Sequence, residues 1–247
     1  MLTAYVHGGP NPRKITIFLD EAGLPYPHQL VDIYEGQNRS AQFLKVNPNG
    51  RLPALLDSEG PDGPIVLWES GAILQYLAEK TGLFLPREGS ARYEVLKWLH
   101  FQLTHAPYLG NAHVYRVMYR EALPSVIKRF TIESARIYGV LDAQLAGARY
   151  VAGSEYSIAD MAWYPWIEYR AWQGQDLGVF RHLRRWFEEI GQRPAVQRGA
   201  SIPWPYTECG PSAMGKRAQA LIERRLADPT FALAARPEDA AMVNLGL

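Results

Sequence analysis

Apolar positions in the first third of the chain follow strand and helix periods in turn. Residues 2–6 alternate and are rich in β-forming types, which predicts a strand. One helix face with the spacing i, i+3, i+4, i+7 is then formed by Ile15, Phe18, Leu19 and Ala22. Shorter patterns predict a strand over 27–33, a helix over 40–46, strands near 54–57 and 65–68, and a helix over 70–81. The order β-α-β-α-β-β-α indicates an α/β class.

The pattern becomes helical throughout after residue 82. Residues 83–89 contain Pro86 and Gly89 and are expected to form a linker. Ser157 and Asp160 predict a capping-box helix start, and Pro165 is expected to kink that helix. Amphipathic helices are predicted over 90–104, 124–144, 158–172 and 180–190. We therefore expect an α/β domain over 1–82, an all-helical domain over 90–200, and a C-terminal extension over 201–247 with no assigned role.

Composition excludes several classes of function. The 247 residues are 47% hydrophobic and 21% charged, with a net charge of +1, which argues against a charge-driven nucleic-acid or membrane partner. No apolar run reaches the ~18 residues that span a bilayer, and no signal-peptide layout opens the chain. Cys209 is the only cysteine, and the six histidines lack ligand spacing, so we expect no metal. A reducing, cytoplasmic location is expected.

Two loop-to-element junctions carry the candidate binding chemistry. Pro53 stands at the start of an apolar strand, and a cis bond before it would turn Leu52 outward to pair with a peptide. Ser70 is expected to cap the following helix, whose start suits a carboxylate. Glu69 beside it suits an ammonium. Together they predict a site for an amino-acid-like head followed by an extended peptide, although an acid and a cap at a helix start can also serve stability alone.

Further short motifs complete a resemblance to the glutathione S-transferase superfamily over roughly residues 1–200. The chain is similar to the Nu-class and disulfide-bond oxidoreductase branch, and to the C-terminal domain of the fungal nitrogen-regulator prion protein. The resemblance implies a thioredoxin-like N-terminal domain, an all-α C-terminal domain, glutathione as co-substrate and a homodimer. Besides the junctions above, the residues that carry it are Pro10-Asn11, Lys14-Ile15-Thr16, Phe43-Leu44, Asn47-Pro48-Asn49, Gly71-Ala72-Ile73, Tyr76-Leu77-Ala78-Glu79-Lys80 and Ser157-Ile158-Ala159-Asp160.

The resemblance also implies roles for single residues in holding glutathione. Glu69 would bind the γ-glutamyl ammonium, Ser70 its carboxylate, and Leu52-Pro53 the peptide backbone. The thiol would lie at Asn11, whose side-chain N–H can donate to a thiolate while the helix from Pro12 lowers the thiol pKa.

Other features bear on the thiol loop and on the rest of the ligand. In this branch a hydroxyl residue is expected at position 9, where this chain has Gly9, so hydroxyl assistance is missing; Asn11 can also be read simply as a helix cap. The glycyl carboxylate needs a cation or amide. Arg51 is the best placed, and Asn38 matches an amide position, whereas Arg39 and Lys45 can equally be solvated loop charges. Arg129 aligns with an arginine that reaches the ligand across a dimer interface.

Aromatic residues are weaker candidates. Tyr5 lies on the first strand and can face the core instead of a thiol. A second apolar pocket, or simply core, is predicted for Phe101, His105, Tyr115, Tyr119 and Trp163. The expected function is disulfide reduction by bound glutathione, acting on a small disulfide. Conjugation of glutathione to electrophiles, peroxide reduction, and a non-catalytic interaction module remain alternatives.

Overall fold

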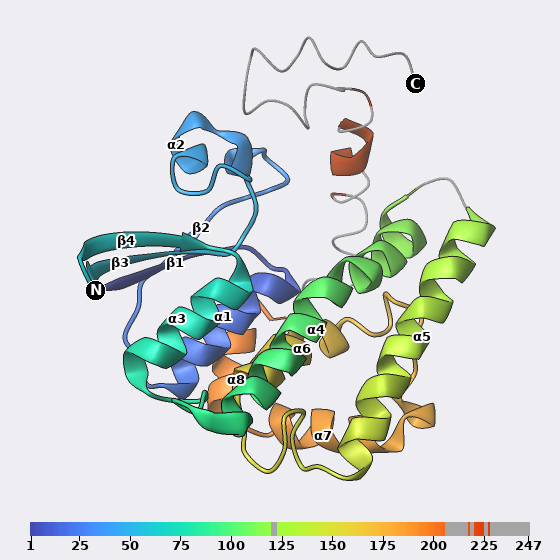
Figure 1. The fold of residues 1–247 in the computed structure, drawn as a ribbon. Helices are drawn as coiled ribbons and strands as arrows, with labels where there is room; N and C mark the ends of the chain where they lie inside the picture. The colour runs from blue at the N-terminus through green and yellow to red at the C-terminus, as the bar shows by residue number, and fades with distance from the viewer. Residues whose placement is uncertain (120–122, 206–216, 218–219, 225–226, 228–247) are drawn as a thin grey trace.

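The computed structural model describes residues 1–119, 123–205, 217, 220–224 and 227. A four-stranded sheet with its helices lies at one side of the molecule, and a larger group of helices lies beside it (Figure 1). The fold is thus a thioredoxin-like α/β domain followed by an all-helical domain, as the sequence predicts.

The sheet has the order β2-β1-β3-β4. Its strands are β1 (Leu2–Val6), β2 (His28–Leu30), β3 (Ala54–Gly60) and β4 (Gly63–Trp68). β1 pairs with β2 in parallel and with β3 antiparallel, and β3 pairs antiparallel with β4. β2 is shorter than the predicted strand over 27–33 because it is an edge strand that pairs with β1 at only three positions. The central β1 contributes Ala4 and Val6 to the core, both fully buried.

Helices α1 (Pro10–Glu21) and α3 (Ser70–Thr81) lie below the sheet in Figure 1, and the short α2 (Ala41–Leu44) lies above the sheet. Two predicted helix starts are shifted. α1 begins at Pro10, so Pro12 is its third residue and not its first. α3 is capped by Glu69, so Ser70 is the first helical residue and not the cap. Gly82 ends α3 at φ 72°, a conformation that glycine adopts without strain.

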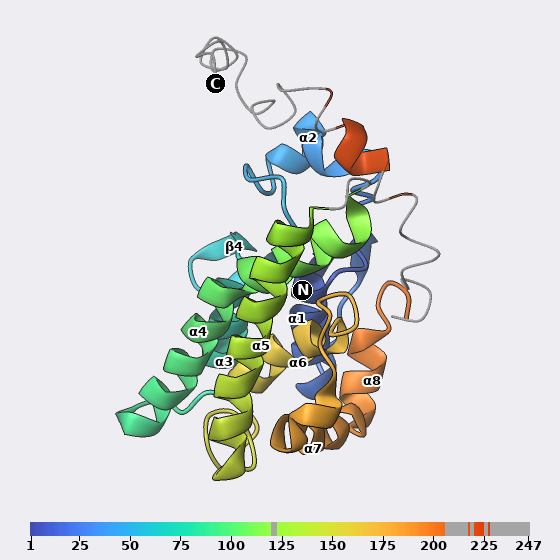
Figure 2. The same cartoon turned by 90° about the vertical axis from the view of Figure 1, so that its right-hand side faces the viewer.

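The helical domain is built around the buried α6, with the long α4 and α5 on one side of it (Figure 2). Its helices are α4 (Gly89–His113), α5 (Pro124–Ala146), α6 (Ile158–Glu168), α7 (Arg181–Gly191) and α8 (Pro194–Ala200). The predicted capping box at Ser157 and Asp160 is confirmed. α4 continues through Pro107 into a π-helical turn over Val114–Met118, so it is longer than predicted. α6 ends four residues before the predicted 172, where the chain turns at Tyr169.

The last helix, α8, returns to pack on the first. A Cβ at Gly199 would lie 2.6 Å from the backbone nitrogen of Ile17, so only glycine permits this approach. The hydroxyl of Thr16 donates to the Gly199 carbonyl at 2.7 Å. Arg193 lies 2.6 Å from Glu21. This contact joins the helical domain to the back of α1.

Candidate functional site

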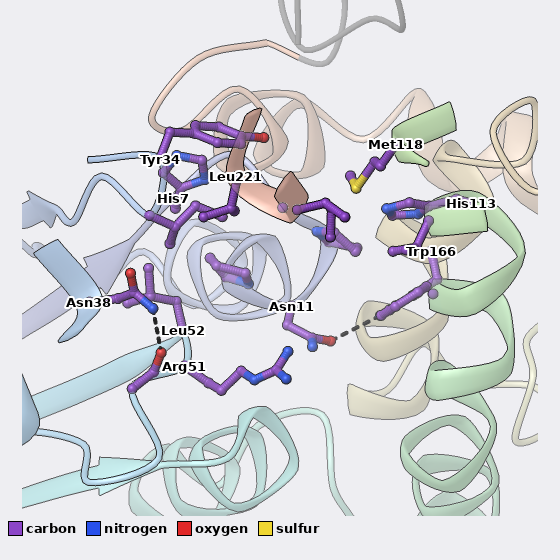
Figure 3. Close-up of a pocket in the computed structure, with 18 residues that line it drawn as sticks. His7, Asn11, Tyr34, Asn38, Arg51, Leu52, His113, Met118, Trp166 and Leu221 are labelled. Atoms are coloured by element: carbon purple, nitrogen blue, oxygen red, sulfur yellow. Dashed lines mark hydrogen bonds between the residues drawn. The ribbon is translucent and has the colours of Figure 1, made fainter. Parts of the chain in front are cut away.

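Two adjoining pockets open at the start of α1, where the sheet domain meets α4 and α6. The first, here called the polar pocket, is lined by Lys14, Glu69, Ser70 and neighbouring residues of α3 and α4. The second, here called the apolar pocket, lies toward β2 and the end of α4 (Figure 3). Asn11, Arg51 and Trp166 line both. A ligand that fills the two pockets therefore passes Asn11.

A buried lysine supports Ser70 in the polar pocket. Lys14 is fully buried, and its Nζ donates to Ser70 Oγ at 3.2 Å and to Gln102 Oε1 at 2.5 Å. Burial lowers the pKa of Lys14 to about 7, an effect that the Glu69 carboxylate opposes. Because the Ser70 oxygen accepts from Lys14, its own proton is available to donate elsewhere. A hydroxyl donor backed by an amine suits a carboxylate ligand.

Glu69 has an unusual backbone. Its φ of 71° and ψ of 114° lie in a region that residues other than glycine rarely adopt. Its carboxylate is exposed at the rim of the polar pocket, next to Ser70. Strain of this kind is retained mostly at functional sites, because ordinary selection for stability would remove it. The rim of the polar pocket thus offers an anion beside the carboxylate-binding hydroxyl, which suits a zwitterionic head group.

Two buried amides hold the loop that carries Leu52. Asn38 Nδ2 donates to the Gly50 carbonyl at 2.8 Å, and Asn47 Nδ2 donates to the Arg51 carbonyl at 2.7 Å. The Leu52-Pro53 peptide bond is cis, and Leu52 lines the apolar pocket. Figure 3 shows the Arg51 side chain extending toward Asn11. Asn38, which the sequence assigns to the glycyl carboxylate, thus also anchors this loop from inside.

Asn11 is held in one orientation by the helical domain. Trp166 Nε1 lies 2.9 Å from Asn11 Oδ1 (Figure 3). An indole N–H can only donate, so the atom that faces it must be the amide oxygen, and the Asn11 amide hydrogens point elsewhere. Pro10 and Pro12 have no N–H, so Asn11 is also the one residue of the first three in α1 with a backbone donor. This arrangement suits an anion such as a thiolate.

The backbone at Gly9 does not require glycine. Its φ of −129° and ψ of 167° are extended, and a Cβ there would find only the Cδ of Pro12 within 4 Å, at 3.9 Å. A residue with a hydroxyl would therefore fit at position 9 without strain. Since the loop would accept it, the missing hydroxyl is a property of this sequence and not of its backbone geometry.

The apolar pocket has a different lining from the one that the sequence indicates. Its walls come from the loop after β2, the end of α4 with the π-helical turn after it, α6 and the C-terminal extension. The residues are Ile33, Tyr34, His113, Val114, Met118, Trp166, Leu221 and Ile222. Leu221 is buried against Tyr34, Tyr169 and Trp172. Arg217 lies 2.9 Å from Asp32, which ties the same segment to the loop after β2. Described residues of the extension therefore form part of the pocket wall.

The aromatic residues predicted for this pocket lie elsewhere. They contact one another or their neighbours on α4, α5 and α6. The ring centroid of Phe101 is 5.5 Å from that of Trp163 and 4.2 Å from that of His105. Tyr115 packs against Tyr119 and Phe130. Of the two alternatives for these rings, a second pocket or simply core, core fits Trp163, which is fully buried, and none of the five lines either of the two pockets. Tyr5 packs against Phe43 at 6.0 Å and does not line either pocket.

Other predicted groups lie outside the two pockets. Arg129 on α5 has a side chain 64% exposed, 3.9 Å from Glu133. Cys209 lies outside the described residues.

Within the part of the chain that is described, no group of three or more His, Cys, Asp or Glu side chains could hold a metal ion. No helix there is long and apolar enough to cross a membrane.

Sequence reasoning missed three contributors to the site: Gln102, His113 and Trp166. Each lies on an apolar helix face, where a buried polar or aromatic side chain looks like ordinary core. In the sequence, Lys14 stands out only as part of the Lys14-Ile15-Thr16 motif. In the structure it is buried because it lies beside Ile15 in a turn of α1 whose residues all face the interior.

The fold and the two pockets define a two-domain protein with a two-part candidate binding site at the junction of its domains. The Glutathione S-transferase N-terminal domain matches residues 8–80, and the Glutathione S-transferase C-terminal domain matches residues 98–194. The chain belongs to the glutathione S-transferase family.

Relatives of known name and structure are similar over most of the chain. Disulfide-bond oxidoreductase YghU of Escherichia coli K12 is 42% identical over 216 residues, which cover 81% of this chain and 74% of the relative. Disulfide-bond oxidoreductase YfcG of the same organism is 41% identical, covering 79% of this chain and 93% of the relative. A glutathione transferase from Pseudomonas putida, solved with one glutathione disulfide per subunit, superposes with a TM-score of 0.77 at 36% identity, covering 82% of this chain and 91% of that one.

Proposed function

We propose that the protein is a glutathione-dependent disulfide reductase in which bound glutathione supplies the attacking thiolate. The observation that carries this proposal is the fixed amide of Asn11 at the junction of the two pockets, whose Nδ2 donates to no other described residue. The γ-glutamyl head lies in the polar pocket, with its ammonium at Glu69 and its carboxylate at Ser70. The backbone pairs with Leu52 before Pro53, and the thiol reaches Asn11. Arg51 and Asn38 face the glycyl carboxylate.

The relatives support the reaction as well as the ligand. Two similar bacterial proteins are named disulfide-bond oxidoreductases, and a similar solved structure holds glutathione disulfide. Glutathione disulfide is the oxidised product that such a reaction would release. Dependence on glutathione also favours a cytoplasmic location, where this thiol is kept reduced.

The chemistry needs two molecules of glutathione for each disulfide. With Cys209 as the only cysteine, the chain cannot form an internal disulfide to store electrons. The first glutathione thiolate attacks one sulfur of the substrate disulfide and expels the other as a thiolate, which leaves a mixed disulfide. A second glutathione thiolate then attacks the glutathione sulfur of this mixed disulfide, giving glutathione disulfide and the second substrate thiolate. The two thiolates take protons from solvent.

A turnover assay tests this function directly. With glutathione and hydroxyethyl disulfide, we expect steady-state production of glutathione disulfide, and the Cys209→Ser variant should retain it. Chlorodinitrobenzene should be a much poorer substrate. Efficient conjugation of chlorodinitrobenzene with no disulfide reduction would favour a transferase instead. Glutathione binding with neither activity would favour a non-catalytic module, and loss of turnover in Cys209→Ser would place the thiol chemistry in the protein itself.

We also infer a twofold dimer in which Arg129 completes the partner's site. The support is the resemblance at this position together with the exposure of the Arg129 side chain, which lines neither pocket of its own chain. Light scattering at micromolar concentration should give twice the mass of one chain, and Arg129→Ala should weaken glutathione binding. The exposed Arg184 on α7 is a matched control. A monomer, or equal affinity in both variants, would contradict this assembly.

A further inference from the structure

His113 is a buried polar residue that the scheme above leaves unused. It ends α4 with a side chain 8% exposed, and its Nδ1 is fully buried without a hydrogen-bond partner among the described residues. The ring packs against both Tyr169 and Trp172, with ring centroids 6.0 Å and 5.3 Å away. Figure 3 shows it projecting from α4 into the apolar pocket beside Met118. Burying an unpaired polar group costs free energy. The other ring nitrogen, Nε2, is not among the buried unpaired atoms, so it is the one that a ligand in the pocket can reach.

The other histidine of this pocket is placed differently. His7 Nε2 faces Asp32 at 3.8 Å, and its ring packs against Tyr34 and Trp204. Its Nε2 is likewise buried without a hydrogen-bond partner among the described residues, but it is directed toward the Asp32 carboxylate in the loop after β2. Burial lowers the pKa of His113 to about 4, so near neutral pH its ring is uncharged and keeps one N–H donor.

Trp166 links Asn11 to the end of α4 that carries His113. The N–H end of its indole lies at Asn11, and its far ring edge lies against Gly110, where an added Cβ would be 3.5 Å from Cη2. His113 is one helical turn beyond Gly110 on the same side of α4, because residues three apart are neighbours on a helix. Asn11 thus lies at the N–H end of the Trp166 indole, and His113 lies one helical turn from the glycine at its far edge.

Disulfide exchange needs two stabilised sulfur positions and not one. The attacking, central and leaving sulfurs lie in line, and with bonds near 2 Å the leaving sulfur is roughly 4 Å from the attacking one. Negative charge moves from the first sulfur to the last during the reaction. If glutathione sulfur lies at Asn11, the leaving sulfur lies farther into the apolar pocket, along Trp166 and toward His113.

We propose that His113 is a catalytic residue that donates its N–H to the thiolate expelled from the substrate disulfide. This inference rests on the proposed function. One sulfur–sulfur bond forms between glutathione and the central sulfur, and the bond to the leaving sulfur breaks with its electron pair. His113 keeps its proton and stabilises the new thiolate by a hydrogen bond, and the thiolate takes its proton from water on release. Glutathione is the only reductant.

The leaving-group dependence of the rate tests this role. Aryl thiolates leave readily without help, whereas alkyl thiolates have higher pKa values and need stabilisation. His113→Phe keeps a ring of similar shape but has no N–H. We expect it to slow reduction of hydroxyethyl disulfide by about tenfold to a hundredfold, as for loss of a hydrogen bond to a charged group. Reduction of a nitro-substituted aryl disulfide should change far less. His113→Gln, which keeps an N–H donor, should recover part of the alkyl rate.

The controls separate this role from packing and from the proposed function. His105→Phe changes a histidine on the same helix whose Nδ1 already contacts the Phe101 carbonyl, and it should leave both rates unchanged. If His113→Phe does not fold, His113→Met removes the N–H with an unbranched side chain. Equal slowing of alkyl and aryl substrates, or no slowing of either, overturns the inference. Wild-type protein that binds glutathione but reduces no disulfide would overturn the proposed function, and this role of His113 would fall with it.

Discussion

Replacing Asn11 by alanine is expected to slow glutathione-dependent disulfide reduction about a hundredfold, as removal of one aligned donor to a reacting anion does in other sites. The amide of Asn11 is fixed by Trp166 at 2.9 Å, so its donors are already in place before the thiolate forms. Without them, the pKa of the bound glutathione thiol should rise and kcat should fall. In the proposed binding mode the head group is held elsewhere, at Glu69 and Ser70, so KM for glutathione should change little. Steady-state kinetics and a thiolate absorbance titration measure the two effects.

A second variant separates the donor from its orientation. Trp166→Phe keeps one aromatic ring but removes the second ring and the indole N–H, which leaves the Asn11 amide free to rotate. The expected loss in kcat is about fivefold, the equivalent of one neutral hydrogen bond of ~1 kcal/mol. Trp163→Phe is the matched control, because its indole N–H on the same helix donates to the Trp98 carbonyl at 3.2 Å and does not reach Asn11. An increase in KM with unchanged kcat in Asn11→Ala would assign Asn11 to binding alone.

The largest loss of stability is expected from Asp160→Ala. The Asp160 carboxylate is fully buried and accepts four hydrogen bonds: from the backbone N–H groups of Val151 and Ser157 at 2.9 and 3.0 Å, from the Ser157 hydroxyl at 3.1 Å, and from Trp186 Nε1 at 2.8 Å. Alanine leaves these donors buried without a partner, at ~1–3 kcal/mol each before relaxation. We expect the free energy of unfolding to fall by about 4 kcal/mol, measured by denaturant titration.

Ser157→Ala provides the scale for that measurement. It removes the capping hydroxyl of α6 but leaves Asp160 with three of its four donors. The usual cost of losing such a cap is ~1 kcal/mol. If the two variants lose the same free energy of unfolding, Asp160 contributes only to the helix cap. The hydrogen bonds that join α6 to α7 and to the loop at Val151 would then add nothing measurable.

The sequence was sufficient where structure depends on neighbours along the chain. The strand and helix order follows local periods, Gly82 ends α3, and the Ser157–Asp160 box begins α6. The candidate ligand groups Glu69 and Ser70 are adjacent, so their chemistry could be read together. Local sequence could not locate the start of α3 to within one residue, because either of two consecutive residues could cap it.

The missing parts depend on contacts between distant segments. Trp166 is separated from Asn11 by 155 positions, and within the apolar helix α6 nothing distinguishes it from a core tryptophan. Gln102 is likewise far from Lys14 in the sequence, and nothing local to either residue indicates that they form a hydrogen bond. In the extension, Leu221 belongs to one buried cluster with Tyr34, and no local pattern in the sequence indicates that these two residues meet. Such information resides in the assembled surfaces and not in any one window of residues.

The return of α8 to α1 sets an order of events during protein synthesis. Domains near an N-terminus commonly fold while the rest of the chain is still being made. Here the backbone of Ile17 and the hydroxyl of Thr16 are covered by Gly199, and Glu21 is paired with Arg193. None of these contacts can form until almost the whole helical domain has left the ribosome. A nascent chain that has completed only its sheet and α3 therefore carries α1 with its rear surface still open to water.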